Sequence, residues 1–196
     1  MKSIVLASGN SGKKAEIEAL LAPFGTRVVT QVELGITEAE EPHDTFLENA
    51  LAKARHVCIA TRLPALADDS GLCVDALGGA PGVHSARYAG EPRSDTRNNE
   101  KLLFEMKEIN SRSAHYKCVL VLMRGPGDAQ PLVASTQWHG SIARQARGAG
   151  GFGYDPLFVP QGTAQTAAEL APEEKNRISH RGQALAKLLE LLQREP

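Results

Sequence analysis

The chain has 196 residues, 42% of them hydrophobic, which is enough for one core or for two small lobes. Its 22 basic and 23 acidic residues give a net charge of −1, without the basic excess of a protein that binds a nucleic-acid polymer, so we expect a small-molecule substrate. The three cysteines are scattered and form no CxxC pair, which argues against a disulfide framework and a zinc site. No run approaches the roughly 20 apolar residues of a membrane span, so we expect a cytoplasmic protein.

The predicted elements alternate between strands and helices, which is typical of an α/β fold. In chain order they are a strand at 2–7, a helix after Gly12 that ends at Pro23, a strand at 27–31, a helix at 46–60, a strand at 65–74 interrupted by Asp68–Gly71, a helix at 95–108, strands at 114–124 and 132–138, a short strand through Val159, and a helical tail from Glu173. We predict a mixed central sheet in a single domain, residues 1–196, because no linker or repeat divides the chain.

Three residues are predicted to cap helices. Thr45 has Glu48 three positions later, which is the spacing of a capping box. Ser94 precedes the helix at 95–108, and Ser179 would start the last helix anew, with residues 180–181 in its first turn.

The long helix at 46–60 carries three polar residues at helical spacing. Asn49, Lys53 and His56 lie together along one flank of its apolar face.

The first candidate site is the turn Ser8-Gly9-Asn10-Ser11-Gly12-Lys13. A glycine-containing turn between a strand and a helix directs backbone N–H groups and the positive end of the helix dipole towards an anion. It is not a Walker A loop, because two residues separate the glycines and Lys14 follows Lys13. Taken alone, the turn fits an ordinary connection with an exposed lysine pair almost equally well.

The second candidate site is a set of acidic residues. Asp68 and Asp69 stand within an apolar strand, where carboxylates need a cation, a hydrogen-bond network or a raised pKa. Because adjacent strand residues point to opposite faces, only one of them would reach a cleft directly if the strand stays regular. Magnesium commonly takes one or two protein carboxylates, so one aspartate with Glu40 or Glu41 would suffice, and the second aspartate could act as general base.

Two further segments carry weaker signals. Residues 148–155 (GAGGFGYD) offer Phe152 as a stacking surface and Asp155 as an acceptor for a nucleobase, but a turn with core aromatics explains this segment better when it is taken alone. Arg181 would share the apolar stripe of the last helix with Leu185 and Leu188, and arginine is rarely buried unless paired. It is therefore a candidate ligand-binding residue.

Together, six blocks follow one another along nearly the whole chain. They are Ser8-Gly9-Asn10-x-x-Lys13, Asp68-Asp69-Ser70-Gly71-Leu72, Gly78-Gly79-x-Pro81-Gly82, Ser85-Ala86-Arg87-Tyr88, Gly151-Phe152-Gly153-Tyr154-Asp155-Pro156 and Ser179-His180-Arg181. This series resembles the HAM1-like inosine/xanthosine triphosphate pyrophosphatases of the bacterial branch.

The resemblance implies hydrolysis of ITP, dITP and XTP to the monophosphate and pyrophosphate by water attack at the α-phosphorus, with Mg2+, which cleanses the nucleotide pool. It also implies a homodimer of two-lobed α/β subunits with the active site in the cleft between the lobes. By matching position, Ser8 to Lys13 and Lys53 would hold the triphosphate, and Ser70 would contact the substrate.

The remaining implied roles concern the metal and the base. Asp69 would be the catalytic base and a metal ligand, joined by Glu40 or Glu41 and by Asp68 as a ligand or a neighbour of one. The base and sugar-phosphate would be surrounded by Phe152, Gly153, Tyr154, Asp155, Lys175, His180 and Arg181. Two alternatives stay open, namely a triphosphate pyrophosphatase with another base preference and a nucleotide-binding sensor without turnover.

Overall fold

The computed structural model describes residues 3–194, so Lys2 of the first predicted strand lies outside the described residues. The strands and α-helices are β1 Ser3–Leu6, α1 Ser11–Leu21, β2 Arg27–Thr30, α2 Phe46–Thr61, β3 Ala65–Val74, α3 Asp95–Glu105, β4 Ser113–Met123, β5 Leu132–Ile142, β6 Phe158–Pro160, α4 Pro172–Ile178 and α5 His180–Gln193. The predicted elements are all present. However, α3 ends at Glu105 rather than Glu108, and β5 continues beyond Trp138 to Ile142.

The strands form a sheet in the order β2-β1-β3-β4-β5-β6. The strand pairs β1–β2 and β1–β3 are parallel, whereas β5 and β6 are antiparallel. The sheet is therefore mixed, as predicted.

The described chain forms two compact units. Unit 1 comprises residues 3–69, 118–136 and 181–194, and unit 2 comprises Ser70–Lys117 and Gln137–His180. Strands β3, β4 and β5 each have residues in both units. That the chain is one functional domain stays a prediction.

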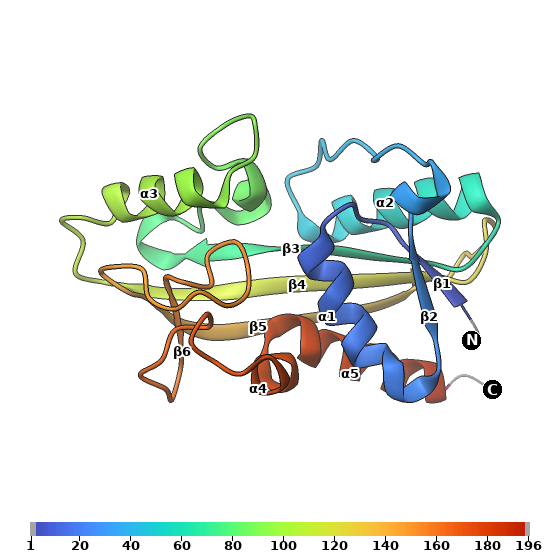
Figure 1. Ribbon diagram of the computed structural model, residues 1–196. Coiled ribbons are helices and arrows are strands. Elements are labelled where there is room, and N and C mark those ends of the chain that lie inside the picture. The colour runs from blue at the N-terminus through green and yellow to red at the C-terminus, as the bar shows by residue number, and fades with distance from the viewer. Residues whose placement is uncertain (1–2, 195–196) are drawn as a thin grey trace. The chain divides into compact units, whose positions relative to one another are not determined.

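Unit 1 has helices on both faces of its strands (Figure 1). Ile4 and Leu6 of β1 belong to a buried cluster that includes residues of α1 and α5, whereas Val5 and Ala7 belong to a second cluster with residues of α2. Successive side chains of a strand point to opposite faces of the sheet. Helices α1 and α5 therefore cover one face, and α2 covers the other.

Strand β3 is continuous, so the predicted interruption at Asp68–Gly71 is wrong. The physical reason is that the charges of Asp68 and Asp69 are met by cationic side chains of neighbouring helices, and the strand need not break to reach water. Within unit 1, Leu66 lies in the cluster of α1 and α5 and Ala67 in the cluster of α2.

The predicted caps are confirmed at two helices by side-chain hydrogen bonds. Thr45 Oγ1 accepts from Glu48 N, and Ser94 Oγ accepts from Arg97 N. The Glu48 carboxylate bonds the Thr45 hydroxyl at 2.6 Å, so the capping box closes through that hydroxyl. Ser179 has extended backbone angles between α4 and α5, so the last helix begins anew at His180, as predicted.

Unit 2 has a core of its own with more aromatic residues. Tyr116, Trp138, Tyr154 and Phe158 are buried there, together with Leu102 of α3. Within residues 3–194, none of the helices has the length and apolar character needed to span a membrane.

Candidate active site

The turn from Ser8 to Lys13 lies where β1 leads into α1. Asn10 caps this helix: its side-chain Oδ1 accepts from the Lys13 backbone N–H at 2.9 Å, and its own N–H donates to Ser8 Oγ at 3.1 Å. A Cβ added at Gly9 would lie 2.8 Å from Glu38 Oε1, so a larger residue there would have to displace the Glu38 side chain. The positive end of the α1 dipole thus faces a tightly fixed turn, which suits an anion.

Lys13 brings this turn to Asp68. Its Nζ donates to Asp68 Oδ1 at 2.8 Å, and Arg181 Nε donates to Asp68 Oδ2. Arg181 also donates through Nη1 to Glu16 of α1. Burial acts to raise the pKa of Asp68, but Arg181 and Lys13 together outweigh it and hold the pKa well below its ordinary value. Asp68 is therefore an ionised carboxylate with a cation on each oxygen.

Asp69 meets a different lysine because it points to the other face of β3. Lys53 Nζ, from α2, donates to Asp69 Oδ1 at 2.6 Å and to Glu41 Oε1 at 2.9 Å. The same ammonium reaches the Asp68 backbone carbonyl at 3.0 Å, and Lys13 Nζ reaches that carbonyl at 3.2 Å. The two lysines thus converge on one peptide group, from the two helical layers of unit 1.

The second carboxylate oxygen of Asp69 is the notable atom of this cluster. Among the described residues, Asp69 Oδ2 is buried and has no hydrogen-bond partner. Burial raises the pKa of Asp69 above its ordinary value, although Lys53 and Lys13 act in the opposite direction. The pKa of Lys53 is also raised, because Asp69 and Glu41 together outweigh the lowering effect of burial. A buried oxygen in this setting calls for a proton, a water or a cation.

The predicted metal residues differ in their placement. Glu41 is half-buried and shares Lys53 with Asp69, whereas Glu40 is exposed. Asp68 uses both oxygens in ion pairs. Within residues 3–194, no group of three or more histidine, cysteine or acidic side chains is arranged to hold a metal ion. The donor set that remains is Asp69 with Glu41, which is sufficient for a magnesium ion that keeps water or phosphate in its shell.

In unit 2, residues 152–155 form a compact turn organised by Asp155. Asp155 Oδ2 accepts from Lys175 Nζ at 2.5 Å and from the Phe152 backbone N–H at 2.9 Å. The Lys175 ammonium also lies 5.1 Å from the centroid of the Phe152 ring. A Cβ at Gly151 would lie 2.0 Å from Asp155 Oδ2, so glycine is required beside this carboxylate. Asp155 thus fixes the turn that presents Phe152.

Helix α3 holds the same turn, by residues that the sequence did not single out. Asp95 Oδ2 accepts from the Gly153 N–H at 2.7 Å, and Asn99 Nδ2 donates to the Gly153 carbonyl at 2.9 Å. Their i, i+4 spacing places both side chains on one side of the helix. That spacing was visible in the sequence, but their target lies more than fifty positions away along the chain.

The other predicted substrate-contacting residues are buried or half-buried. The Tyr154 hydroxyl donates to the Ser85 carbonyl at 2.9 Å, and the Tyr154 ring belongs to the core of unit 2. His180 stacks on Tyr116, with ring centroids 4.5 Å apart and planes 6° from parallel. Ser70 is half-buried within β3. These placements leave their contact with a substrate as a prediction.

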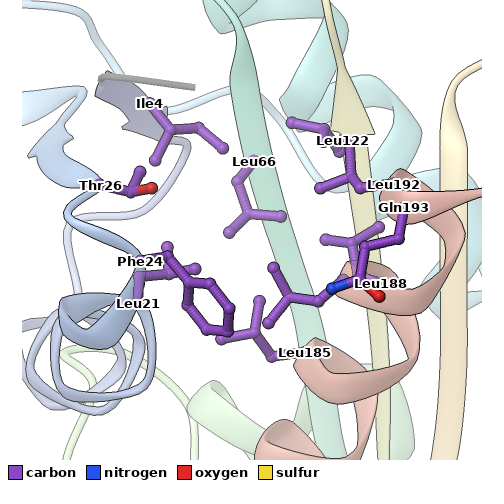
Figure 2. Close-up of a pocket in the computed structure, with 11 residues that line it drawn as sticks. Ile4, Leu21, Phe24, Thr26, Leu66, Leu122, Leu185, Leu188, Leu192 and Gln193 are labelled. Atoms are coloured by element: carbon purple, nitrogen blue, oxygen red, sulfur yellow. The ribbon is translucent and has the colours of Figure 1, made fainter. Parts of the chain in front are cut away.

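A pocket in unit 1 has a different chemistry (Figure 2). It measures about 300 Å³ and is lined almost entirely by apolar side chains, and Figure 2 shows Leu21, Leu185 and Leu188 around it. None of the predicted site residues is among the described residues that line it. A highly charged triphosphate would lose its hydration there without gaining a cation, so we do not regard this pocket as the substrate site.

Comparisons with known proteins identify the family of the chain. A sequence model of the Ham1 family matches residues 4–191. The chain is 61% identical over 192 residues to the dITP/XTP pyrophosphatase of Nitrosomonas europaea, covering 98% of this chain and 95% of that protein. It is 58% identical over 195 residues to the dITP/XTP pyrophosphatase of Ralstonia nicotianae, covering 98% of this chain and 97% of that protein.

A solved structure extends the match to three dimensions. The HAM1 protein from Coxiella burnetii superposes with a TM-score of 0.90 at 48% sequence identity, and the match covers 100% of both chains. Sequence and fold thus agree over nearly the full length, and the chain belongs to the Ham1 family.

Proposed function

We propose that this chain hydrolyses non-canonical purine nucleoside triphosphates, among them ITP, dITP and XTP, to the monophosphate and pyrophosphate. Two relatives that share 61% and 58% of their aligned residues with it are dITP/XTP pyrophosphatases. The observation that carries the proposal within the structure is Asp69, whose buried Oδ2 has no hydrogen-bond partner among the described residues and whose other oxygen is held by Lys53. Lys53 thus holds one oxygen of the carboxylate and leaves the other oxygen able to accept a proton or bind a cation.

Hydrolysis of a triphosphate generally needs a divalent cation, for which we propose Mg2+. The free Oδ2 of Asp69 and the half-buried carboxylate of Glu41 fit such an ion, because magnesium prefers oxygen ligands and takes only one or two carboxylates. Asp68 fits it less well, since Lys13 and Arg181 occupy its oxygens. When bound, the cation would neutralise phosphate charge and raise the acidity of water.

The residues of the chain would then have separate roles in the reaction. The N–H groups of the Ser8–Lys13 turn, with the ammonium groups of Lys13 and Lys53, would bind the phosphates and stabilise the leaving group. Asp69 would orient a water molecule and accept its proton as the water oxygen bonds to the α-phosphorus. The bond from that phosphorus to the bridging oxygen breaks, and pyrophosphate leaves with the electron pair. Attack at this atom explains why pyrophosphate, and not orthophosphate, would be released.

For base selection we propose Phe152 as a stacking surface and Lys175, His180 and Arg181 as polar contacts. Hypoxanthine and xanthine offer a 6-oxo acceptor and an N1–H donor, whereas adenine reverses both, so a donor aimed at the 6-oxo group rejects adenine. Arg181 already donates through Nε and Nη1 to Asp68 and Glu16. Its contact with the base stays a prediction, as do the homodimer and the cytoplasmic location.

The decisive experiment compares ITP, XTP, dUTP, GTP and ATP with and without Mg2+. We expect ITP and XTP to exceed ATP in kcat/KM by about a hundredfold or more, because an adenine leaves buried polar groups unpaired. Chelation of the metal should remove the activity, and phosphate analysis should find pyrophosphate as the product. Preference for dUTP would instead support a pyrophosphatase with another base preference, and tight binding without turnover would support a sensor.

A second prediction tests the stacking role of Phe152. Replacing Phe152 with alanine should raise KM by about tenfold for every purine triphosphate, because base–aromatic stacking contributes about 1–3 kcal/mol and does not distinguish purines. Steady-state kinetics with ITP, XTP and GTP would measure it. The matched control is Phe104→Ala, since Phe104 is 79% exposed on α3 and its loss should leave KM unchanged. A selective loss for ITP would refute the stacking role.

A further inference from the structure

The segment that carries Glu41 has no regular structure of its own. Residues 36–45, which we call the Glu41 loop, connect a short helical turn to α2 without forming a helix or a strand. A loop without backbone ladders keeps its course only if side chains elsewhere hold it. The position of the Glu41 carboxylate is therefore set by whatever anchors this loop.

One flank of α2 anchors the loop at three points within unit 1. Asn49 bonds the backbone of His43, Lys53 bonds Glu41, and His56 Nε2 lies 2.9 Å from the Thr37 carbonyl. These helix residues are the polar flank noted in the sequence, at intervals of four and three positions. The flank thus follows the loop along most of its length.

Asn49 makes the most specific of these contacts. Its Oδ1 accepts from the His43 N–H at 3.1 Å, and its Nδ2 donates to the His43 carbonyl at 2.9 Å. The Asn49 side chain is buried, with 1% of its surface exposed, whereas His43 is exposed, so both bonds are partly sheltered from water. An amide that offers a donor and an acceptor to one residue fixes both the position and the orientation of that backbone.

Lys53 cannot fix the loop in this way, because its ammonium is shared. It also bonds Asp69 and the Asp68 carbonyl, and an ammonium is a point charge without a preferred plane. Glu41 lies only two residues from His43, and two extended residues span about 7 Å at most. Anchoring His43 therefore confines Glu41 to the neighbourhood of Lys53 and Asp69.

We propose that Asn49 is a positioning residue that holds the Glu41 carboxylate beside Asp69 by clamping His43. The inference rests on the proposed function, in which Glu41 and Asp69 together meet the metal-bound triphosphate. The hydrogen bonds described for the Asn49 side chain both go to His43, so its effect on the reaction would pass through the position of Glu41.

A double-mutant cycle tests this coupling. Asn49→Ala should lower kcat/KM for ITP by about tenfold at limiting Mg2+, since losing two partly buried hydrogen bonds releases the loop. Glu41→Gln should lower it at least as much. In the Glu41→Gln background, Asn49→Ala should cost less than about twofold, because no carboxylate is left to position.

A matched control separates positioning from general destabilisation. Asn98 is a buried asparagine of unit 2, with 2% of its surface exposed, that likewise bonds backbone groups. The fold-changes in kcat/KM caused by Asn98→Ala and by Glu41→Gln should multiply in the double variant, which means that the two residues are not coupled. Asn49→Asp serves as the second variant where alanine prevents folding. It keeps the shape and the acceptor of the side chain but loses the donor. Its effect on kcat/KM should depend on Glu41 in the same way, but should be smaller.

Hydrogen exchange supplies a readout independent of activity. Asn49→Ala should speed exchange of the His43 amide and its loop neighbours, whereas Asn98→Ala should not. If the losses in kcat/KM from Asn49→Ala and Glu41→Gln multiply, or if hydrogen exchange at His43 is unchanged, the positioning role of Asn49 is wrong. The proposed role of Glu41 would not be affected by that result. A silent Glu41→Gln would instead remove Glu41 from the proposed mechanism, and the role of Asn49 with it.

Discussion

Replacing Asp69 with asparagine should lower kcat for ITP by about three orders of magnitude and leave ITP binding measurable. A positioned general base contributes about 10²- to 10⁴-fold, and the amide cannot accept the proton of the attacking water. The substitution preserves the volume of the side chain, and its Oδ1 can still accept from Lys53. Pyrophosphate release gives kcat, and calorimetric titration with ITP gives the dissociation constant.

The control for this substitution is Asp75→Asn on the same segment of chain. The Asp75 side chain is 60% exposed just beyond β3, so its neutralisation should leave kcat unchanged. A near-normal rate for Asp69→Asn would exclude Asp69 as the base. Loss of ITP binding together with the rate would instead indicate that Asp69 mainly organises the phosphate-binding residues.

The second large effect concerns stability. Replacing Arg181 with methionine should lower the free energy of unfolding by about 3–5 kcal/mol, because removal of this partner leaves the buried charge of Asp68 only partly compensated. The side chain of Asp68 is 0% exposed, and Arg181 covers one of its two oxygens. Only Lys13 would remain as its cationic partner among the ion pairs described for Asp68. Chemical denaturation followed by circular dichroism measures the loss.

Two further variants serve as controls for the effect of Arg181→Met on stability. Arg194→Met removes a surface pair with Glu190, in which Arg194 is 76% exposed, and should change stability by less than about 1 kcal/mol. Adding Asp68→Asn to Arg181→Met should cost less than the sum of the two single effects, because each removes the charge that the other leaves unpaired. Additive effects would show that the pair is not coupled.

Most elements of this fold could be predicted from short stretches of sequence. Thr45 and Ser94 cap helices because their own side chains accept from backbone N–H groups three residues later. The strands follow β-branched and aliphatic runs for an equally local reason. The blocks that identify the Ham1 family are also local, so the amino-acid sequence alone is enough to propose the family and the class of reaction.

What could not be predicted depends on residues that are far apart in the chain. The sequence left open which of Glu40 and Glu41 belongs with the aspartates, and packing of the Glu41 loop on α2 favours Glu41. It suggested a break at Asp68–Gly71, whereas a continuous β3 sends Asp68 to Lys13 and Asp69 to Lys53. Asp95 and Asn99 gave no signal of their contact with Gly153.

The sequence by itself thus determined the elements, their caps and the family, because propensity, capping and apolar spacing act over a few neighbouring residues. Only the tertiary structure decided which cation meets each aspartate and left Asp69 Oδ2 without a hydrogen-bond partner among the described residues. The physical reason is that the direction of a strand side chain selects a face of the sheet, and the helix that covers this face supplies its partner.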